Sequence, residues 1–172
     1  MPSLKALESL IAQYELANDC FKIAARATKS KVSQLLKDTT FETNIRTAQK
    51  NIQKTRADSA DLAVAAMWAY FERDLIEYVQ RKGEKLAHLK PQPFTTNFSQ
   101  KVATEIEYWR FAELLDLFSG HIDANLLGHA KQIKQFRDWV VHRNPNKPAP
   151  SKTDPSTAYR VFKDIITQVN GL

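Results

Sequence analysis

Apolar residues recur every three or four positions along almost the whole chain of 172 residues. This spacing puts them on one face of a helix, whereas a half-buried strand requires strict alternation of apolar and polar residues. Signals of tight turns between strands are also missing, because the one Asn-Gly pair, Asn170-Gly171, stands at the C-terminal end. The pattern therefore predicts an all-α fold.

Two long helical segments are expected in the first half of the chain. The first runs from Ser3, which is suited to cap it, into the thirties. The second runs from near Thr40 to Gly83, and the pattern allows either one helix or two helices that break near Thr55.

Prolines and capping residues divide the second half of the chain. The two prolines within Lys90–Thr96 predict a loop, after which Asn97 is expected to cap a third helix that ends before Gly120. A fourth helix is expected from 123 or 125 to 142, and the last begins with Asp154 as N-cap and Pro155 in its first turn. We expect one domain over residues 1–172, a helical bundle with long antiparallel helices and a short C-terminal helix.

The charge balance is basic, with 25 Lys and Arg residues against 19 Asp and Glu residues, and this favours polyanionic partners. Cys20 is the only cysteine, which excludes an internal disulfide and a metal site with several thiolates. No apolar run approaches the roughly 18 residues of a membrane span, and the first residues lack a signal-peptide pattern. We expect a cytoplasmic protein with no metal, no cofactor and no membrane partner.

Basic residues are concentrated in one stretch of the second segment. Arg46, Lys50 and Lys54 are four residues apart, which places them along one helix face, and no acidic residue lies between Glu42 and Asp58. Such a basic stripe is either an ordinary solvated face or a track that contacts RNA phosphates.

The strongest cluster of ionisable residues lies at the end of the fourth helix: Arg137, Asp138, His142 and Arg143. Asp138 and His142 are four residues apart, so the carboxylate is able to orient the imidazole. Arg137 lies about 140° around an ideal helix from His142, so the two converge on one ligand only through a frayed helix end and a long side chain. The alternative is a basic last turn that complements the helix dipole.

The segment Phe136-Arg137-Asp138-Trp139-Val140-Val141-His142-Arg143 resembles the signature of the HEPN superfamily (higher eukaryotes and prokaryotes nucleotide-binding). That signature is Arg, a polar residue, a short spacer and His, on a late helix of a helical bundle. The resemblance covers residues 125–145.

The resemblance implies a metal-independent endoribonuclease that acts as a homodimer, as a bacterial toxin or defence component with an antitoxin protein as a further partner. RNA supplies its own nucleophile, the 2′-OH. Catalytic roles then fall to His142 in proton transfer, Arg137 in holding the phosphate and Asp138 in orienting His142. Lys134 and Arg143 beside the motif, together with the basic stripe, are the expected RNA contacts.

Two features bear on this interpretation. Asn144 stands where toxins that are paired with a minimal nucleotidyltransferase carry a modified tyrosine. The alternative to an enzyme is a non-catalytic HEPN-like module that binds nucleic acid or a partner protein.

Overall fold

The computed structural model describes residues 3–30, 33–42, 44–142 and 148–172. Helices follow one another throughout these ranges, and no strand is formed in them, so the predicted all-α bundle is confirmed. None of the helices in the described ranges has both the length and the apolar character needed to cross a membrane. The elements are α1 (Lys5–Ser30), α2 (Ser33–Leu36), α3 (Ile45–Glu84), η1 (Lys85–His88), α4 (Phe94–Glu105), η2 (Ile106–Tyr108), α5 (Phe111–Asp116), α6 (Ala124–His142) and α7 (Pro155–Asn170).

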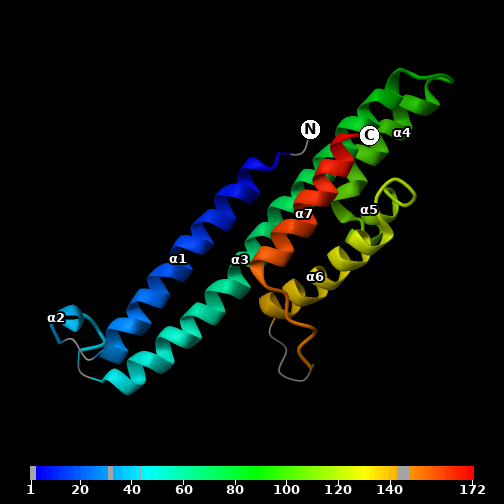
Figure 1. The fold of residues 1–172 in the computed structure, drawn as a ribbon. Coiled ribbons are helices and arrows are strands. Elements are labelled where there is room, and N and C mark those ends of the chain that lie inside the picture. The colour runs from blue at the N-terminus through cyan, green and yellow to red at the C-terminus, as the bar shows by residue number, and fades with distance from the viewer. Residues whose placement is uncertain (1–2, 31–32, 43, 143–147) are drawn as a thin grey trace.

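The axis of the fold is α3, a single helix of 40 residues. It does not break near Thr55, because no proline or glycine interrupts the sequence before Gly83. It begins at Ile45 rather than near Thr40, since the side chain of Asn44 caps it by accepting a hydrogen bond from the Thr47 N–H at 3.1 Å. The antiparallel helix α1 runs along α3 from its start to about Asp74, which accepts a hydrogen bond from the Ser3 N–H (Figure 1). It is described as far as Ser30, and α2 follows from Ser33, with residues 31–32 outside the described ranges.

The predicted third helix is divided into three segments, α4, η2 and α5. It starts at Phe94, so Asn97 lies inside α4 and is not its cap. The chain leaves helical geometry at Trp109 and Arg110, whose backbones are extended. In a continuous helix Ile106 and Phe111 would point about 140° apart, but both are buried, and the break allows both to face the core.

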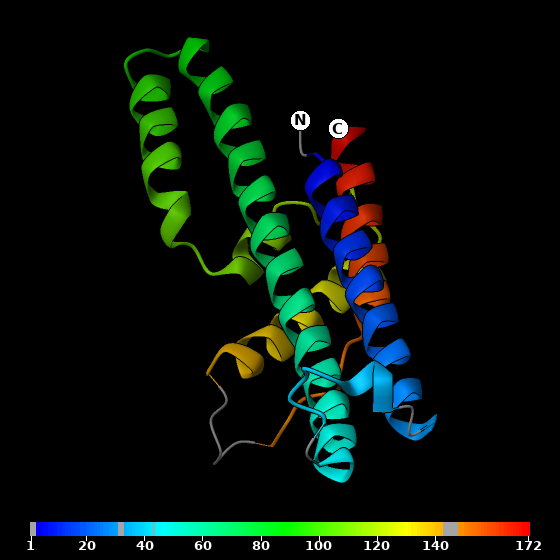
Figure 2. The same cartoon turned by 90° about the vertical axis from the view of Figure 1, so that its left-hand side faces the viewer.

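The helix α4 turns back along the last turns of α3 (Figure 2). Gly83 permits this close approach, since a Cβ atom at that position would lie 3.0 Å from Cγ1 of Val102. The Arg73 guanidinium donates to the Glu107 carboxylate at 2.9 Å, and the Gln80 amide donates to the same carboxylate at 3.1 Å. These contacts fix the position of η2, and therefore of the break that follows it.

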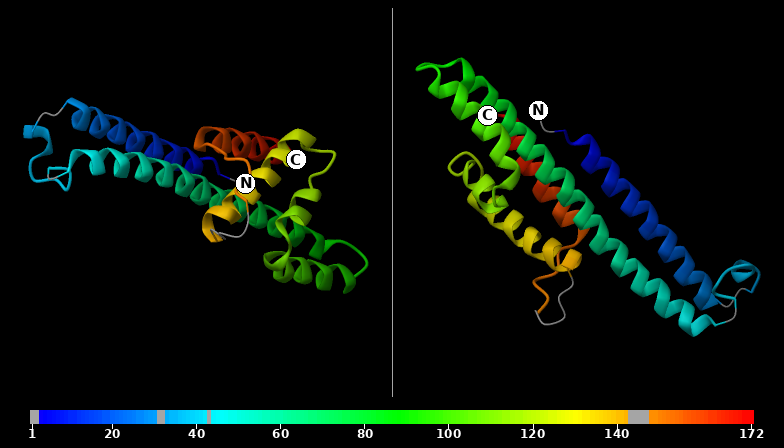
Figure 3. Two further views of the ribbon diagram at one scale, coloured as in Figure 1. Left: turned by 90° about the horizontal axis from the view of Figure 1, so that it is seen from below. Right: turned by 180° about the vertical axis from the view of Figure 1, so that it is seen from behind.

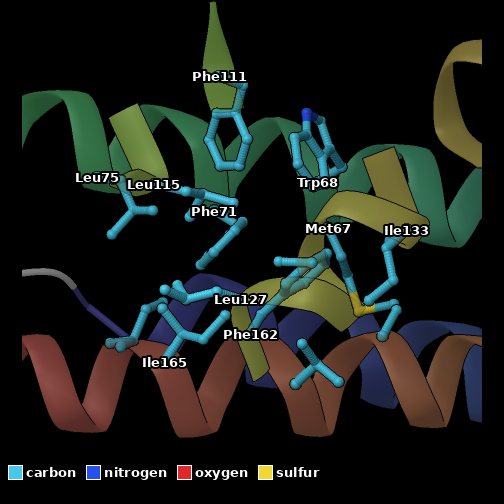
Figure 4. Close-up of a cluster of buried hydrophobic side chains, with 14 of the residues drawn as sticks. Met67, Trp68, Phe71, Leu75, Phe111, Leu115, Leu127, Ile133, Phe162 and Ile165 are labelled. Atoms are coloured by element: carbon cyan, nitrogen blue, oxygen red, sulfur yellow. The ribbon is translucent and has the colours of Figure 1, made fainter. Parts of the chain in front are cut away.

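The core is built around four aromatic side chains of α3, α5 and α7 (Figure 4). The rings of Trp68 and Phe111 meet edge to face with centroids 4.4 Å apart, and those of Phe71 and Phe162 stack at 4.3 Å. Trp68, Phe71 and Phe162 are completely buried. Burial of each large apolar side chain contributes about 1.5–3 kcal/mol, so this cluster holds α5 and α7 against α3.

The last two helices begin as predicted. The carboxylate of Asp123 accepts the N–H groups of Asn125 and Leu126 at the start of α6, and Asp154 accepts that of Thr157 at the start of α7. The helix α7 packs on α3 and contacts both α1 and α6 (Figure 3). The apolar side of α6 is buried in this core, which directs its polar side outward.

Candidate functional site

Asp138 is the centre of a cluster of charged side chains on α6. Its Oδ2 accepts a hydrogen bond from Nζ of Lys134 at 2.5 Å, and its Oδ1 accepts one from Nη1 of Arg137 at 3.1 Å. Partial burial of Asp138 raises its pKa, but the hydrogen bonds from Lys134 and Arg137 outweigh this and leave the pKa below its ordinary value of 3.8. Asp138 is therefore an ionised carboxylate that holds the Arg137 side chain in place.

The structure does not bring His142 to this cluster. The helix α6 remains regular to His142. The exposed His142 side chain therefore lies about 140° around the helix from Arg137 and about 7.5 Å further along its axis. Both oxygens of Asp138 are bound by Lys134 and Arg137, and within the described residues Asp138 forms no hydrogen bond with His142. The predicted orientation of His142 by Asp138 is therefore not what this structure contains.

Arg137 lies at the wall of a groove of about 540 Å³ between α6, α3 and the break before α5. Lys131, Lys134 and Arg137 are three residues apart and line it from α6, while Arg110 lines it from the break. The Nε atom of Arg137 is buried and has no hydrogen-bond partner among the described residues. This atom is closed off from solvent, so the character of the groove comes from its four cationic side chains, which suit it to an anionic ligand.

Two further side chains of the groove were not predicted from the sequence. Trp109 falls within the predicted third helix, but it stands at the break with 37% of its surface exposed. Glu72 of α3 lines the groove, and its Oε2 accepts a hydrogen bond from Nε1 of the buried Trp68 at 3.1 Å. The sequence feature that could have identified Glu72 is its spacing of four residues from Trp68, which puts both side chains on one face of α3.

The other predicted RNA contacts lie elsewhere. Arg46, Lys50 and Lys54 are exposed near the start of α3, and 18 helical residues, about 27 Å of axis, separate Lys54 from Glu72. This interval is five full turns, so Lys54 and Glu72 share one face of α3. Arg143 lies outside the described residues.

Metal-ligand clusters are absent from the described part of the chain. The carboxylate of Asp123, which stands between His121 and His129 in the sequence, caps α6.

Comparison with known proteins gives no relative for this arrangement. The chain matches no protein-family model, no curated protein and no solved structure.

Proposed function

We propose that this chain is a metal-independent endoribonuclease of the HEPN type, which acts as a toxin or defence component. The observation that carries the proposal is the Arg137 guanidinium. It belongs to the Arg-Asp-x-x-x-His signature, it is held by an ionised Asp138, and it lines a groove together with Lys131 and Lys134. Fixed guanidinium and ammonium groups bind phosphate through charge-assisted hydrogen bonds.

The proposed chemistry uses the 2′-OH of RNA as the nucleophile. The 2′-oxygen attacks the adjacent phosphorus, the bond from phosphorus to the 5′-oxygen breaks, and the products are a 2′,3′-cyclic phosphate and a 5′-OH. One proton leaves the 2′-OH and one reaches the leaving 5′-oxygen. An imidazole gains and loses protons near neutral pH, which suits His142 to this transfer, while Arg137 stabilises the charge that develops on the phosphate.

A homodimer supplies the imidazole that this groove lacks. His142 and Arg137 of one chain face different directions on a regular α6. A two-fold axis near the end of α6 brings His142 of a second copy toward Arg137 of the first. His142 is exposed, and its neighbour Val141 is 53% exposed, as contact with a second copy requires.

The exposed position of His142, outside the residues that line the groove, also favours a second candidate function. It is a non-catalytic module that binds nucleic acid or a partner protein through the basic groove alone. This module needs the groove cations but not His142, so substitutions separate the two functions.

The test is cleavage of mixed RNA by the purified chain in EDTA. We expect cleavage to persist in the chelator and to fall at least a hundredfold in His142→Ala and Arg137→Ala, as is typical when a proton-transfer or charge-stabilising group is removed. His129→Ala on the same helix and Arg160→Ala on α7 are exposed controls outside the groove, and both should retain activity.

Two results would contradict the proposal. Cleavage that stops in EDTA and returns with magnesium overturns the metal-free chemistry, and RNA binding without cleavage favours the module. Mixing the two inactive variants tests the dimer. If Arg137 and His142 act from different copies, random pairing restores about a quarter of the parent activity, because about half the dimers then carry one intact site of two. If activity does not recover, Arg137 and His142 of each active site belong to the same chain.

A further inference from the structure

The groove beside Arg137 is divided into two chemically different parts. On the α6 side it presents the cations Lys131, Lys134 and Arg137. From α3 and the break before α5 it presents the carboxylate of Glu72 and the indole of Trp109, together with the cation Arg110. A ligand that fills the groove therefore carries negative charge at one end, and at the other end a flat ring with hydrogen-bond donors on its edge.

The cations of α6 are oriented from behind by acids. Lys134 and Arg137 bind Asp138, and Nζ of Lys131 lies 2.9 Å from Oδ1 of Asp116. The pairs of Lys134 and Arg137 with the partly buried Asp138 orient these two side chains before a ligand arrives, which reduces the entropy lost on binding. Neither Asp138 nor Asp116 lines the groove, so the charged side chains that line it from α6 are all positive. A phosphate is a ligand of the opposite charge.

Trp109 provides a flat surface for a base. Its ring is more than one-third exposed, and its backbone is held by the hydrogen bond from its N–H to the Ile106 carbonyl at 3.2 Å. Stacking of a base on an aromatic ring of this kind does not depend on base identity, so Trp109 supplies affinity for a nucleotide and no selectivity.

Glu72 determines which base fits. Its Oε2 is bound by the Trp68 indole, and its Oε1 accepts no hydrogen bond from any described residue. An ionised carboxylate accepts hydrogen bonds and donates none. Guanine presents two adjacent donors, N1–H and the 2-amino group, on one edge. Adenine and cytosine each place a ring acceptor beside their amino donor, and uracil places its single N–H between two carbonyl oxygens, so each of them turns an acceptor toward the carboxylate.

We propose that this groove is a nucleotide subsite that selects guanine, with the base stacked on Trp109, its donor edge on Glu72 and its phosphate on Arg137 and Lys134. The volume of about 540 Å³ lies within the roughly 300–1,000 Å³ of small-molecule sites. If the groove takes RNA, which rests on the proposed function above, the enzyme cleaves at the phosphate of a guanosine.

Calorimetric titration with 5′-GMP and 5′-AMP tests the subsite without reference to cleavage. We expect GMP to bind about tenfold to a hundredfold more tightly than AMP, as a paired donor edge usually gives. Glu72→Gln should remove most of this preference, because the amide presents both an acceptor and a donor. Trp109→Ala should weaken both nucleotides by about tenfold. The matched controls are Glu84→Gln on the same helix and Tyr108→Ala beside Trp109. Tyr108 is 87% exposed and lies outside the groove.

Mapping of RNA ends distinguishes a guanine in a chain from a free nucleotide. The parent should cut next to guanosine, and Glu72→Gln should cut with less base preference. Selective GMP binding without RNA cleavage would keep the subsite for a free guanine nucleotide and refute the ribonuclease. Cleavage without base preference, together with equal affinity for GMP and AMP, would overturn the subsite and leave the ribonuclease standing. Circular dichroism of each variant confirms that it is folded.

Discussion

The hydrogen bond from Trp68 to Glu72 connects the buried core to the groove, and the substitution Trp68→Phe measures its contribution. Trp68 is completely buried, so the smaller ring leaves a cavity that costs about 2 kcal/mol of unfolding free energy. Loss of the donor to a carboxylate adds about 1 kcal/mol, which is below the usual range for charged partners because Glu72 is half-exposed. The expected total, about 3 kcal/mol, is a large part of the stability of a typical domain, about 5–15 kcal/mol.

Urea unfolding followed by circular dichroism, in a double-mutant cycle with Glu72→Met, separates the two terms. Methionine removes the acceptor but keeps the length of the side chain, and the cycle should give a coupling energy of about 1 kcal/mol between positions 68 and 72. Glu72→Gln is the control, because its amide oxygen still accepts from the indole, and it should cost less than about 0.5 kcal/mol. A coupling energy near zero would refute the argument that the core orients the carboxylate of the groove.

Two further predictions concern the cap of α7 and the basic stripe. Asp154→Ala should cost about 1 kcal/mol in thermal unfolding at neutral pH, whereas Asp154→Asn, which retains a capping oxygen, should cost much less. The hydrogen bond from the Thr157 hydroxyl lowers the pKa of Asp154 from 3.8. The cap therefore contributes its full stabilisation at a pH above the pKa that Asp154 has in the unfolded chain. The difference in unfolding free energy between the parent and the Ala variant should shrink as the pH falls through the lowered pKa of the folded state. Replacing Arg46, Lys50 and Lys54 by Gln should weaken RNA binding and reduce the log–log salt slope by roughly 0.7 for each phosphate that the stripe neutralises in the parent. Equal affinities of parent and triple variant at two ionic strengths would identify the stripe as ordinary surface.

A capping side chain next to a regular apolar pattern predicted the starts of α6 and α7 correctly, at Asp123 and Asp154. The same signal at Asn97 was wrong, because α4 begins three residues earlier. The break at Trp109 and Arg110 was not predictable, because a continuous helix through this segment also gives a plausible apolar face. The break is decided by the burial of both Ile106 and Phe111 in the core, and local periodicity carries no information about this packing.

The candidate site was predictable in its residue types and less so in its geometry. The motif identified Arg137 and Asp138, and the structure joins them at 3.1 Å. The pairing of Asp138 with His142 was favoured by their spacing, but Lys134 has the same spacing on the other side and takes the carboxylate. Equal spacing gave no basis for choosing between an imidazole and an ammonium, and a protonated lysine is the stronger partner for a carboxylate at neutral pH.

The groove side chains are held in place by the core, because residues that line the groove lie close in the sequence to residues that are buried in the core. Trp68 is buried while Glu72, one turn later, lines the groove, and Arg110 lines it next to the buried Phe111, which also forms part of its wall. The same arrangement holds on α6, where Phe136 is buried beside Arg137. Each groove side chain therefore extends from backbone that is fixed by core packing, which is what precise ligand positioning requires. Substitutions of Lys134 or Arg137 should change binding with little loss of stability, whereas substitutions of the buried neighbours Phe71 and Phe136 should destabilise the fold.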